Sequence, residues 1–192
     1  MDGEAKPLRA DAQRNRERVL AAAEMVLARD GTAASMRTIA AEAGVGLGTI
    51  YRQFATKEAL VEAIVFERAR QLIELAEELA NAPDPGVTFF EFFSQIVEFS
   101  TRKRSLTDAL PDPDLAIDKD RSGIEQEMRR VLSALLERAQ AAHAVRGDFG
   151  IDELLALLLA TSLAAEKATW SDEFRERTLG FVFDGIRYRT GD

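Results

Sequence analysis

The 192-residue sequence contains no cysteine and only one histidine, His143. Without thiols there are no disulfides, thiolate zinc sites, iron–sulfur clusters or cysteine nucleophiles, and a single imidazole cannot build a histidine-rich metal site. No apolar run approaches the roughly 20 residues that span a bilayer, and the first residues lack the apolar stretch of a secretion signal. We therefore expect a cytoplasmic protein without membrane, metal or cofactor partners.

The net charge of −8 is distributed unevenly along the chain. Residues 9–57 carry eight basic and five acidic side chains, whereas residues 61–192 carry sixteen basic and twenty-five acidic ones. A polyanion would have to bind the N-terminal third, because the acidic remainder repels it.

Helical periodicity covers nearly the whole chain, and no alternating pattern of five or more residues indicates a strand. Breaker clusters at residues 81–86 and 110–120 divide the pattern, Ser35, Thr56 and Ser171 are expected N-caps, and Gly147 and Gly150 are expected to end the sixth helix. The expected helices cover residues 12–29, 36–43, 47–53, 57–81, 87–103, 121–145, 151–168 and 171–189. The predicted fold class is all-α: a three-helix, homeodomain-like domain at residues 9–57, followed by a larger bundle of about six helices at residues 58–190.

Residues 36–54 have the spacing of a helix-turn-helix. Ala40, Gly44 and Ile50 stand at positions 0, +4 and +10, where a small residue permits a close crossing, glycine supplies a positive φ and a branched side chain fills the core. The second helix would leave Arg52 and Gln53 free for bidentate contacts to guanine and adenine. The same pattern also fits a helical hairpin in an ordinary bundle, with these two side chains solvated.

The segment 14–60, and above all its part IAAEAGVGLGTIYRQFATKEAL, resembles the DNA-binding domain of the TetR family of bacterial transcriptional regulators. The remainder agrees with that family in length and helical character but matches no motif, and the chain as a whole is most similar to regulators with an SbtR-like C-terminal domain. Gly46 departs from the serine common at its position, which removes an N-cap hydroxyl, and Leu47 suits either a thymine methyl group or packing. The resemblance implies contacts to base edges or phosphates from Arg37, Thr38, Leu47, Gly48, Thr49, Tyr51, Arg52, Gln53 and Lys57.

Four arginines precede or open the first helix. Such residues could form a basic arm that reaches phosphate or the minor groove, or they could simply be a solvated helix N-terminus. They are Arg9, Arg14, Arg16 and Arg18.

The helices expected at residues 151–168 and 171–189 are more apolar than one protein face requires. Two such helices from each of two subunits would form a four-helix dimer interface, and a short reading helix needs a two-fold mate for specificity. A monomer in which both helices are central is the alternative. The candidate interface residues are Leu154, Leu155, Leu158, Phe174, Phe181, Val182 and Ile186.

The resemblance also implies a small-molecule pocket in the C-terminal helices whose occupancy changes DNA affinity. Aromatic residues crowd the helix expected at residues 87–103, although such crowding fits a plain core as well. His143, near the end of a helix, is expected to be a cap. The candidate pocket residues are Phe89, Phe92, Phe93, Phe99, Met128 and Trp170.

Together these patterns predict a homodimeric, ligand-responsive repressor that binds a palindromic double-stranded DNA operator and an unidentified small-molecule effector. One alternative is a helical protein–protein interaction module or small-molecule carrier whose helix-turn-helix is structural. Another is an all-α enzyme, which would need polar catalytic groups converging in the acidic part. The sequence shows no such arrangement, so we expect no catalytic residues.

Overall fold

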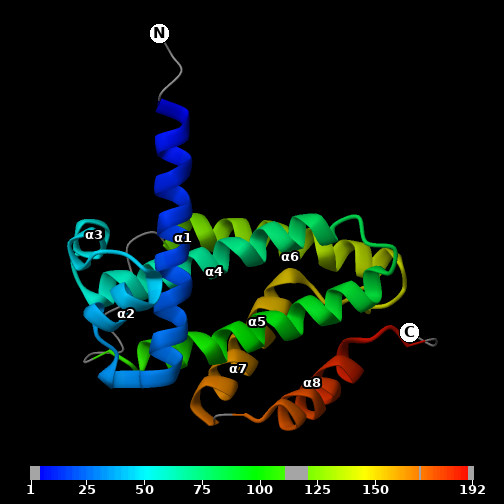
Figure 1. Cartoon of the computed structure of the whole chain (residues 1–192). Helices are drawn as coiled ribbons and strands as arrows, with labels where there is room; N and C mark the ends of the chain where they lie inside the picture. Colours follow the sequence, from blue (N-terminus) through cyan, green and yellow to red (C-terminus); the bar gives the residue numbers. More distant parts are fainter. Residues whose placement is uncertain (1–4, 111–120, 169, 190–192) are drawn as a thin grey trace. The chain divides into compact units, whose positions relative to one another are not determined.

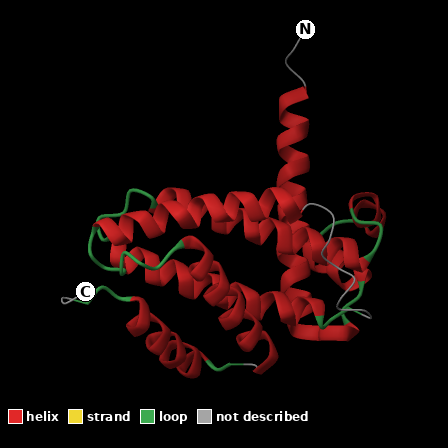
Figure 2. Cartoon of the chain, turned by 180° about the vertical axis from the view of Figure 1, so that it is seen from behind, coloured by secondary structure: helices red, strands yellow, loops and turns green. Residues whose placement is uncertain are grey.

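The computed structural model describes residues 5–110, 121–168 and 170–189. In these residues every regular element is a helix, apart from one isolated antiparallel bridge between Val145 and Arg187 (Figures 1 and 2). The predicted all-α class is confirmed. The elements are α1 (Ala5–Asp30), a 3₁₀ turn η1 (Gly31–Ala33), α2 (Met36–Ala43), α3 (Leu47–Gln53), α4 (Lys57–Leu79), α5 (Pro85–Thr107), α6 (Arg121–Ala141), α7 (Ile151–Ala168) and α8 (Asp172–Ile186).

The helix boundaries depart from the predicted ones mainly at α1 and α5, which are longer than expected. α5 begins inside the first breaker cluster because Pro85 occupies the first helical position, where its missing N–H has no intrahelical partner to lose. Asp84 caps this end, since its carboxylate accepts from the Val87 N–H at 2.9 Å. Beyond Leu110, the second breaker cluster lies outside the described residues.

The three predicted N-caps are confirmed. The hydroxyl of Ser35 accepts from the backbone N–H of Thr38 at 3.1 Å, and that of Thr56 accepts from Ala59 at 3.1 Å. The hydroxyl of Ser171 accepts from Phe174 at 3.3 Å. Each cap satisfies one of the N–H groups that a helix start leaves unpaired.

α6 ends on a left-handed residue that is not glycine. His143 has a φ of 55°, its N–H donates to Gln140 O at 3.0 Å, and the N–H of Ala144 donates to Ala139 O at 2.9 Å. This pair of bonds is a Schellman cap with His143 as its left-handed residue. The expectation that Gly147 and Gly150 end the helix is therefore wrong, and the expectation that His143 caps it is confirmed.

The chain forms two compact units, to which α4 and α5 both contribute. The N-terminal unit contains the described residues up to Glu67 and from Arg104 to Leu110, and the C-terminal unit contains the other described residues. Each has its own apolar core. No described helix is both long enough and apolar enough to cross a membrane. The N-terminal core includes Val19, Ala40, Ile50, Phe54, Leu60, Leu106 and Leu110, and the C-terminal core includes Phe92, Phe93, Leu132, Leu154, Leu179 and Ile186.

The α6 cap predicts an unusual response to substitution at His143. His143→Gly and His143→Ala both lose the edge-to-face contact between the His143 and Tyr188 rings, whose centroids are 5.0 Å apart. Only the alanine variant keeps a Cβ that opposes the left-handed backbone. We expect the glycine variant to be more stable by about 1 kcal/mol in urea unfolding. Equal stabilities would contradict a left-handed cap here.

Candidate nucleic-acid interface and cavity

The turn between α2 and α3 holds α3 in a defined orientation. Gly44 has a φ of 66° and its N–H donates to the carbonyls of Ala40 and Ala41. The Arg18 guanidinium donates to Ala43 O at 2.8 Å, and a Cβ at Gly44 would lie 3.3 Å from its Nη2 atom. The positive φ favours glycine, and a Cβ here would also push the Arg18 guanidinium a few tenths of an ångström away from Ala43 O. Ile50 of α3 is fully buried, so the opposite face of α3 meets solvent.

α3 exposes most of the residues predicted to read DNA. Gly48, Tyr51, Arg52 and Gln53 are exposed and Thr49 is half-buried. The Arg52 Nε donates to its own helix at Gly48 O, 3.2 Å away. These side chains come from consecutive turns of one short helix, so they form one polar, hydrogen-bonding face.

Leu47 is half-buried and packs against the N-terminal core. Of the two roles expected for it, packing and contact with a thymine methyl group, this position favours packing. On α2, Arg37 is exposed, whereas Thr38 is half-buried with its hydroxyl 2.8 Å from that of Ser35. Arg37 is thus the freer of the two α2 side chains.

Lys57 has a partner that sequence reasoning missed. Its Nζ donates to Ala109 O at 2.9 Å, and burial lowers the pKa of Lys57 below its ordinary value. Ala109 follows α5, and it is buried in the N-terminal core together with Leu106 of the last α5 turn and with Leu110. The contact joins residues far apart in sequence, so no local pattern could reveal it. Because an ammonium has three N–H donors, two remain for other acceptors.

Two of the arginines expected in a basic arm instead make contacts inside the N-terminal unit. The Arg16 guanidinium lies 4.9 Å from the centroid of the Phe54 ring, and Arg18 caps the carbonyl end of α2. Both hold α1 against the helix-turn-helix, so a free arm is wrong for these two residues. The side chain of Arg9 lies outside the described residues.

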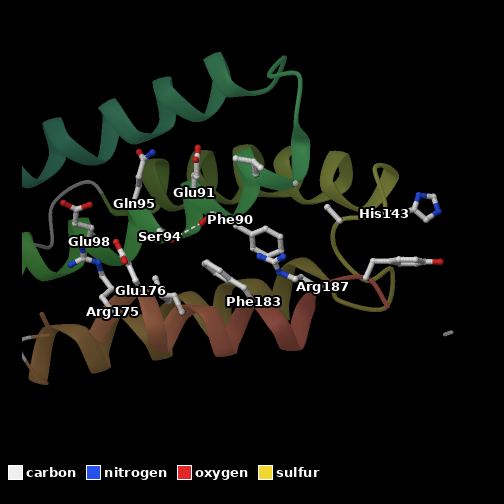
Figure 3. Close-up of a pocket in the computed structure, with 15 residues that line it drawn as sticks. Phe90, Glu91, Ser94, Gln95, Glu98, His143, Arg175, Glu176, Phe183 and Arg187 are labelled. Atoms are coloured by element: carbon white, nitrogen blue, oxygen red, sulfur yellow. Dashed lines mark hydrogen bonds between the residues drawn. The ribbon is translucent and has the colours of Figure 1, made fainter. Parts of the chain in front are cut away.

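The C-terminal unit contains a cavity of about 800 Å³ between α5 and α8 (Figure 3). Phe90 and Phe183 lie in its middle, with ring centroids 4.8 Å apart. Glu98, Arg175 and Glu176 gather at one end, and His143 and Arg187 lie at the other. The remaining lining residues are Gly86, Val87, Glu91, Ser94, Gln95, Ala144, Leu179 and Tyr188.

None of the six predicted pocket residues lines this cavity. Phe89, Phe92 and Phe93 are buried in the C-terminal core, on a face of α5 different from that of Phe90. The cavity follows a four-residue repeat on each helix, which was the available sequence signal. The repeat is Gly86, Phe90, Ser94 and Glu98 on α5, and Arg175, Leu179, Phe183 and Arg187 along α8 and its end. The other three predicted residues, Phe99, Met128 and Trp170, are half-buried elsewhere.

The predicted dimer residues divide into two groups. Leu154, Leu158 and Ile186 are buried in the C-terminal core, because α7 and α8 each turn one apolar stripe inward. Phe174 and Phe181 are 43% and 74% exposed, and Leu155 and Val182 are half-buried. Sequence reasoning did not select Leu159 and Leu163, which are 62% and 45% exposed.

A helix-turn-helix whose second helix is exposed, followed by a larger helical unit, is typical of DNA-binding transcriptional regulators. The sequence model of the protein family "Bacterial regulatory proteins, tetR family" matches residues 19–64. That of the "Transcriptional regulator SbtR-like, C-terminal domain" matches residues 84–188. The chain belongs to the TetR family of DNA-binding transcriptional regulators, which are not enzymes.

Solved structures of family members are similar over nearly the whole chain. A TetR regulatory protein of Mycobacterium vanbaalenii is 37% identical with a TM-score of 0.71, covering 94% of this chain and 99% of that one. A TetR regulator of Streptomyces coelicolor is 30% identical with a TM-score of 0.70, covering 91% and 99%. The Escherichia coli regulator UidR is 29% identical over 91 residues, which is 47% of this chain and only 44% of UidR.

Gly46 gives a direct test of the α3 start. It is the N-cap of α3 without a side-chain cap, its backbone is extended (φ −69°, ψ 143°), and a Cβ there would meet only the Thr49 hydroxyl, at 3.8 Å. Gly46→Ser therefore fits and can accept from the helix start, whereas Gly46→Ala cannot. We expect the serine variant to exceed the alanine variant by about 1 kcal/mol in unfolding free energy, measured in urea. A serine variant no more stable than alanine would rule out this capping geometry.

Proposed function

We propose that the protein is a homodimeric, ligand-responsive repressor that binds a palindromic operator. In this proposal residues 9–57 bind DNA, and residues 58–190 bind the ligand and form the dimer. The observation that carries it is the polar face of α3, which the burial of Ile50 turns toward solvent.

α3 would enter a major groove and read base edges. Arg52 suits the two acceptors of guanine, and Gln53 suits the donor and acceptor of adenine. Gly48 allows close approach, Thr49 would contact a base edge or phosphate, and Tyr51 would donate its hydroxyl to a phosphate. All five belong to the described surface of α3.

Residues beside α3 would position it on the backbone. Arg37, exposed on α2, can reach a base edge or phosphate, and Thr38 lies one residue farther along the same helix. Lys57 can donate to a phosphate while it keeps its bond to Ala109 O, because that bond uses one of three N–H groups. These contacts set register and salt dependence rather than sequence preference.

The exposed side chains of α7 and α8 support a dimer. Leu155, Leu159 and Leu163 recur every four residues along α7, and Phe174 and Phe181 stand on α8. Apolar residues gathered on two adjacent helices are typical of an interface between subunits. A two-fold dimer would place two α3 helices on successive turns of the operator.

The cavity of the C-terminal unit supports a ligand. Its volume of about 800 Å³ lies in the range of small-molecule sites. A ligand that binds better to a form with a different spacing between the two α3 helices would lower the population of the DNA-binding form.

If α3 reads base edges, substitution of its side chains should weaken DNA binding in a specific way. Wild-type protein is used to select duplexes from a random-sequence pool, and we expect an inverted repeat with half-sites about 10 base pairs apart. Arg52→Ala should weaken binding to that duplex by about 1–3 kcal/mol and relax one base position. Lys57→Ala should weaken binding to all duplexes alike. It should also reduce the number of counterions released on binding, measured from the salt dependence of the affinity, by about one.

The matched control for these variants is Arg102→Ala. Arg102 is exposed on α5 in the C-terminal unit, so its removal changes the net charge equally without touching the proposed interface. Equal affinities for wild type and the Arg52 and Lys57 variants in a gel-shift titration would refute this assignment.

The dimer surface predicts that one charge will separate the subunits. Phe181→Glu introduces a carboxylate where the side chain is 74% exposed, so the subunit fold should survive while the interface loses an apolar contact and buries a charge. We expect the dimer dissociation constant to rise by about 30-fold or more in sedimentation equilibrium. Met25→Glu on α1, where Met25 is 57% exposed, is the matched control and should leave it unchanged. A dimer as tight as wild type after Phe181→Glu would exclude this surface.

A further inference from the structure

The charges around the cavity are not balanced. Its lining contains three carboxylates, from Glu91, Glu98 and Glu176, and two guanidinium groups, from Arg175 and Arg187. Glu98 and Arg175 are half-buried, whereas Glu91, Glu176 and Arg187 are exposed at the cavity mouth. Charges of one sign along a cleft with apolar walls still concentrate ligands of the opposite sign. Some of these charged side chains form ion pairs within the protein. The sign of the charge that stays unpaired in the lining therefore decides which ligand charge the cavity accepts.

Both arginines already have carboxylate partners on α8. Arg175 pairs with Asp172 at 2.9 Å, and Arg187 approaches Asp184 at 3.8 Å. Neither aspartate lines the cavity, so each neutralises its arginine from outside. The cavity thus offers no unpaired cation to an anionic ligand.

The carboxylates are paired less completely. Glu98 pairs with Arg102 at 2.5 Å. Among the described residues, neither Glu91 nor Glu176 has an ion-pair or hydrogen-bond partner. Glu176 lies beside Glu98 and Arg175 at one end of the cavity, next to the apolar middle (Figure 3). The charge left unpaired in the lining is negative.

The apolar middle also suits a cation. The guanidinium of Arg187 lies 4.9 Å from the centroid of the Phe90 ring, so a cationic ligand would have to displace this group from the ring face or bind beside the Phe183 ring. Phe90 is flanked by Phe183, and Leu179 completes the apolar lining. An aromatic surface next to unpaired carboxylates matches a molecule that is both hydrophobic and positively charged.

α8 connects the cavity to the surface of the subunit. Leu179 and Phe183 face the cavity, whereas Phe174 and Phe181 of the same helix are exposed. A ligand wedged against the inner face of α8 would bear on the helix that supplies the outer face. The cavity is thus placed to influence the proposed dimer surface.

We propose that the cavity between α5 and α8 binds a hydrophobic organic cation, held by the Phe90 and Phe183 rings and by the carboxylates of Glu91 and Glu176. This inference rests on the proposed function only for its regulatory consequence. The binding itself requires neither DNA nor an operator.

Tetraphenylphosphonium and tetraphenylborate are suitable probes, because they share one shape and carry opposite charges. In calorimetric titrations of the full-length protein, the phosphonium should bind at least about tenfold more tightly than the borate. The Glu91→Gln/Glu176→Gln double variant should lose about five- to tenfold in affinity for the phosphonium and gain affinity for the borate. Phe90→Leu should weaken the phosphonium through loss of the ring face.

Glu78→Gln is the matched control, since Glu78 is exposed on α4 and does not line the cavity. It should leave both affinities unchanged, and circular dichroism checks that every variant keeps its helices. Equal binding of the two probes, no binding of the phosphonium by folded wild type, or an unchanged affinity in the double variant would each overturn the proposal.

Operator binding measured with and without the phosphonium separates this inference from the proposed function. If the phosphonium binds through Glu91 and Glu176 but operator affinity stays constant, the cavity inference holds and ligand-responsive repression fails for this ligand class. If wild type binds its operator but not the phosphonium, the inference fails while DNA binding stands.

Discussion

The complete burial of Ile50 is the constraint on which the proposed DNA-binding surface of α3 depends. α3 is too short to hold its own orientation, and its helical bonds alone would be marginal. Ile50 anchors it in the N-terminal core, Gly44 supplies the left-handed turn, and Arg18 closes the carbonyl end of α2. Because these three contacts fix α3, its polar residues point outward together. The reading face is thus a consequence of packing on the opposite side.

α8 satisfies two constraints with one short sequence. Its inward residues, Leu179 and Phe183, complete the C-terminal core and the cavity wall, while Phe174 and Phe181 remain exposed. Leaving two large aromatic side chains in water is unfavourable unless another surface covers them. The same helix therefore contributes both to the proposed ligand cavity and to the proposed dimer surface, without an additional structural element.

The sequence predicted the fold and the bounds of α2 and α3 well, because both depend on local patterns. Ala40, Gly44 and Ile50 have a fixed spacing, and helical periodicity extends along the chain. The cavity was missed because its four-residue repeats on α5 and α8 show that each helix has such a face, whereas which phenylalanine faces the cavity depends on how the two helices pack. Phe89 and Phe90 are neighbours with opposite roles, one in the core and one at the cavity. The bond between Lys57 and Ala109 was hidden for the same reason, since it joins distant segments.

Residues of α5 belong to both units of the chain. Its first turns, from Gly86 to Glu98, line the cavity, and Leu106 near its end is buried in the core around α3. The helix is continuous between these points, so one element contributes side chains to the packing of each unit. The following residue Ala109 holds the ammonium of Lys57. A close-packed core has few intermediate arrangements. Displacing Leu106 would therefore disturb the core that orients α3 and the carbonyl that positions Lys57 together.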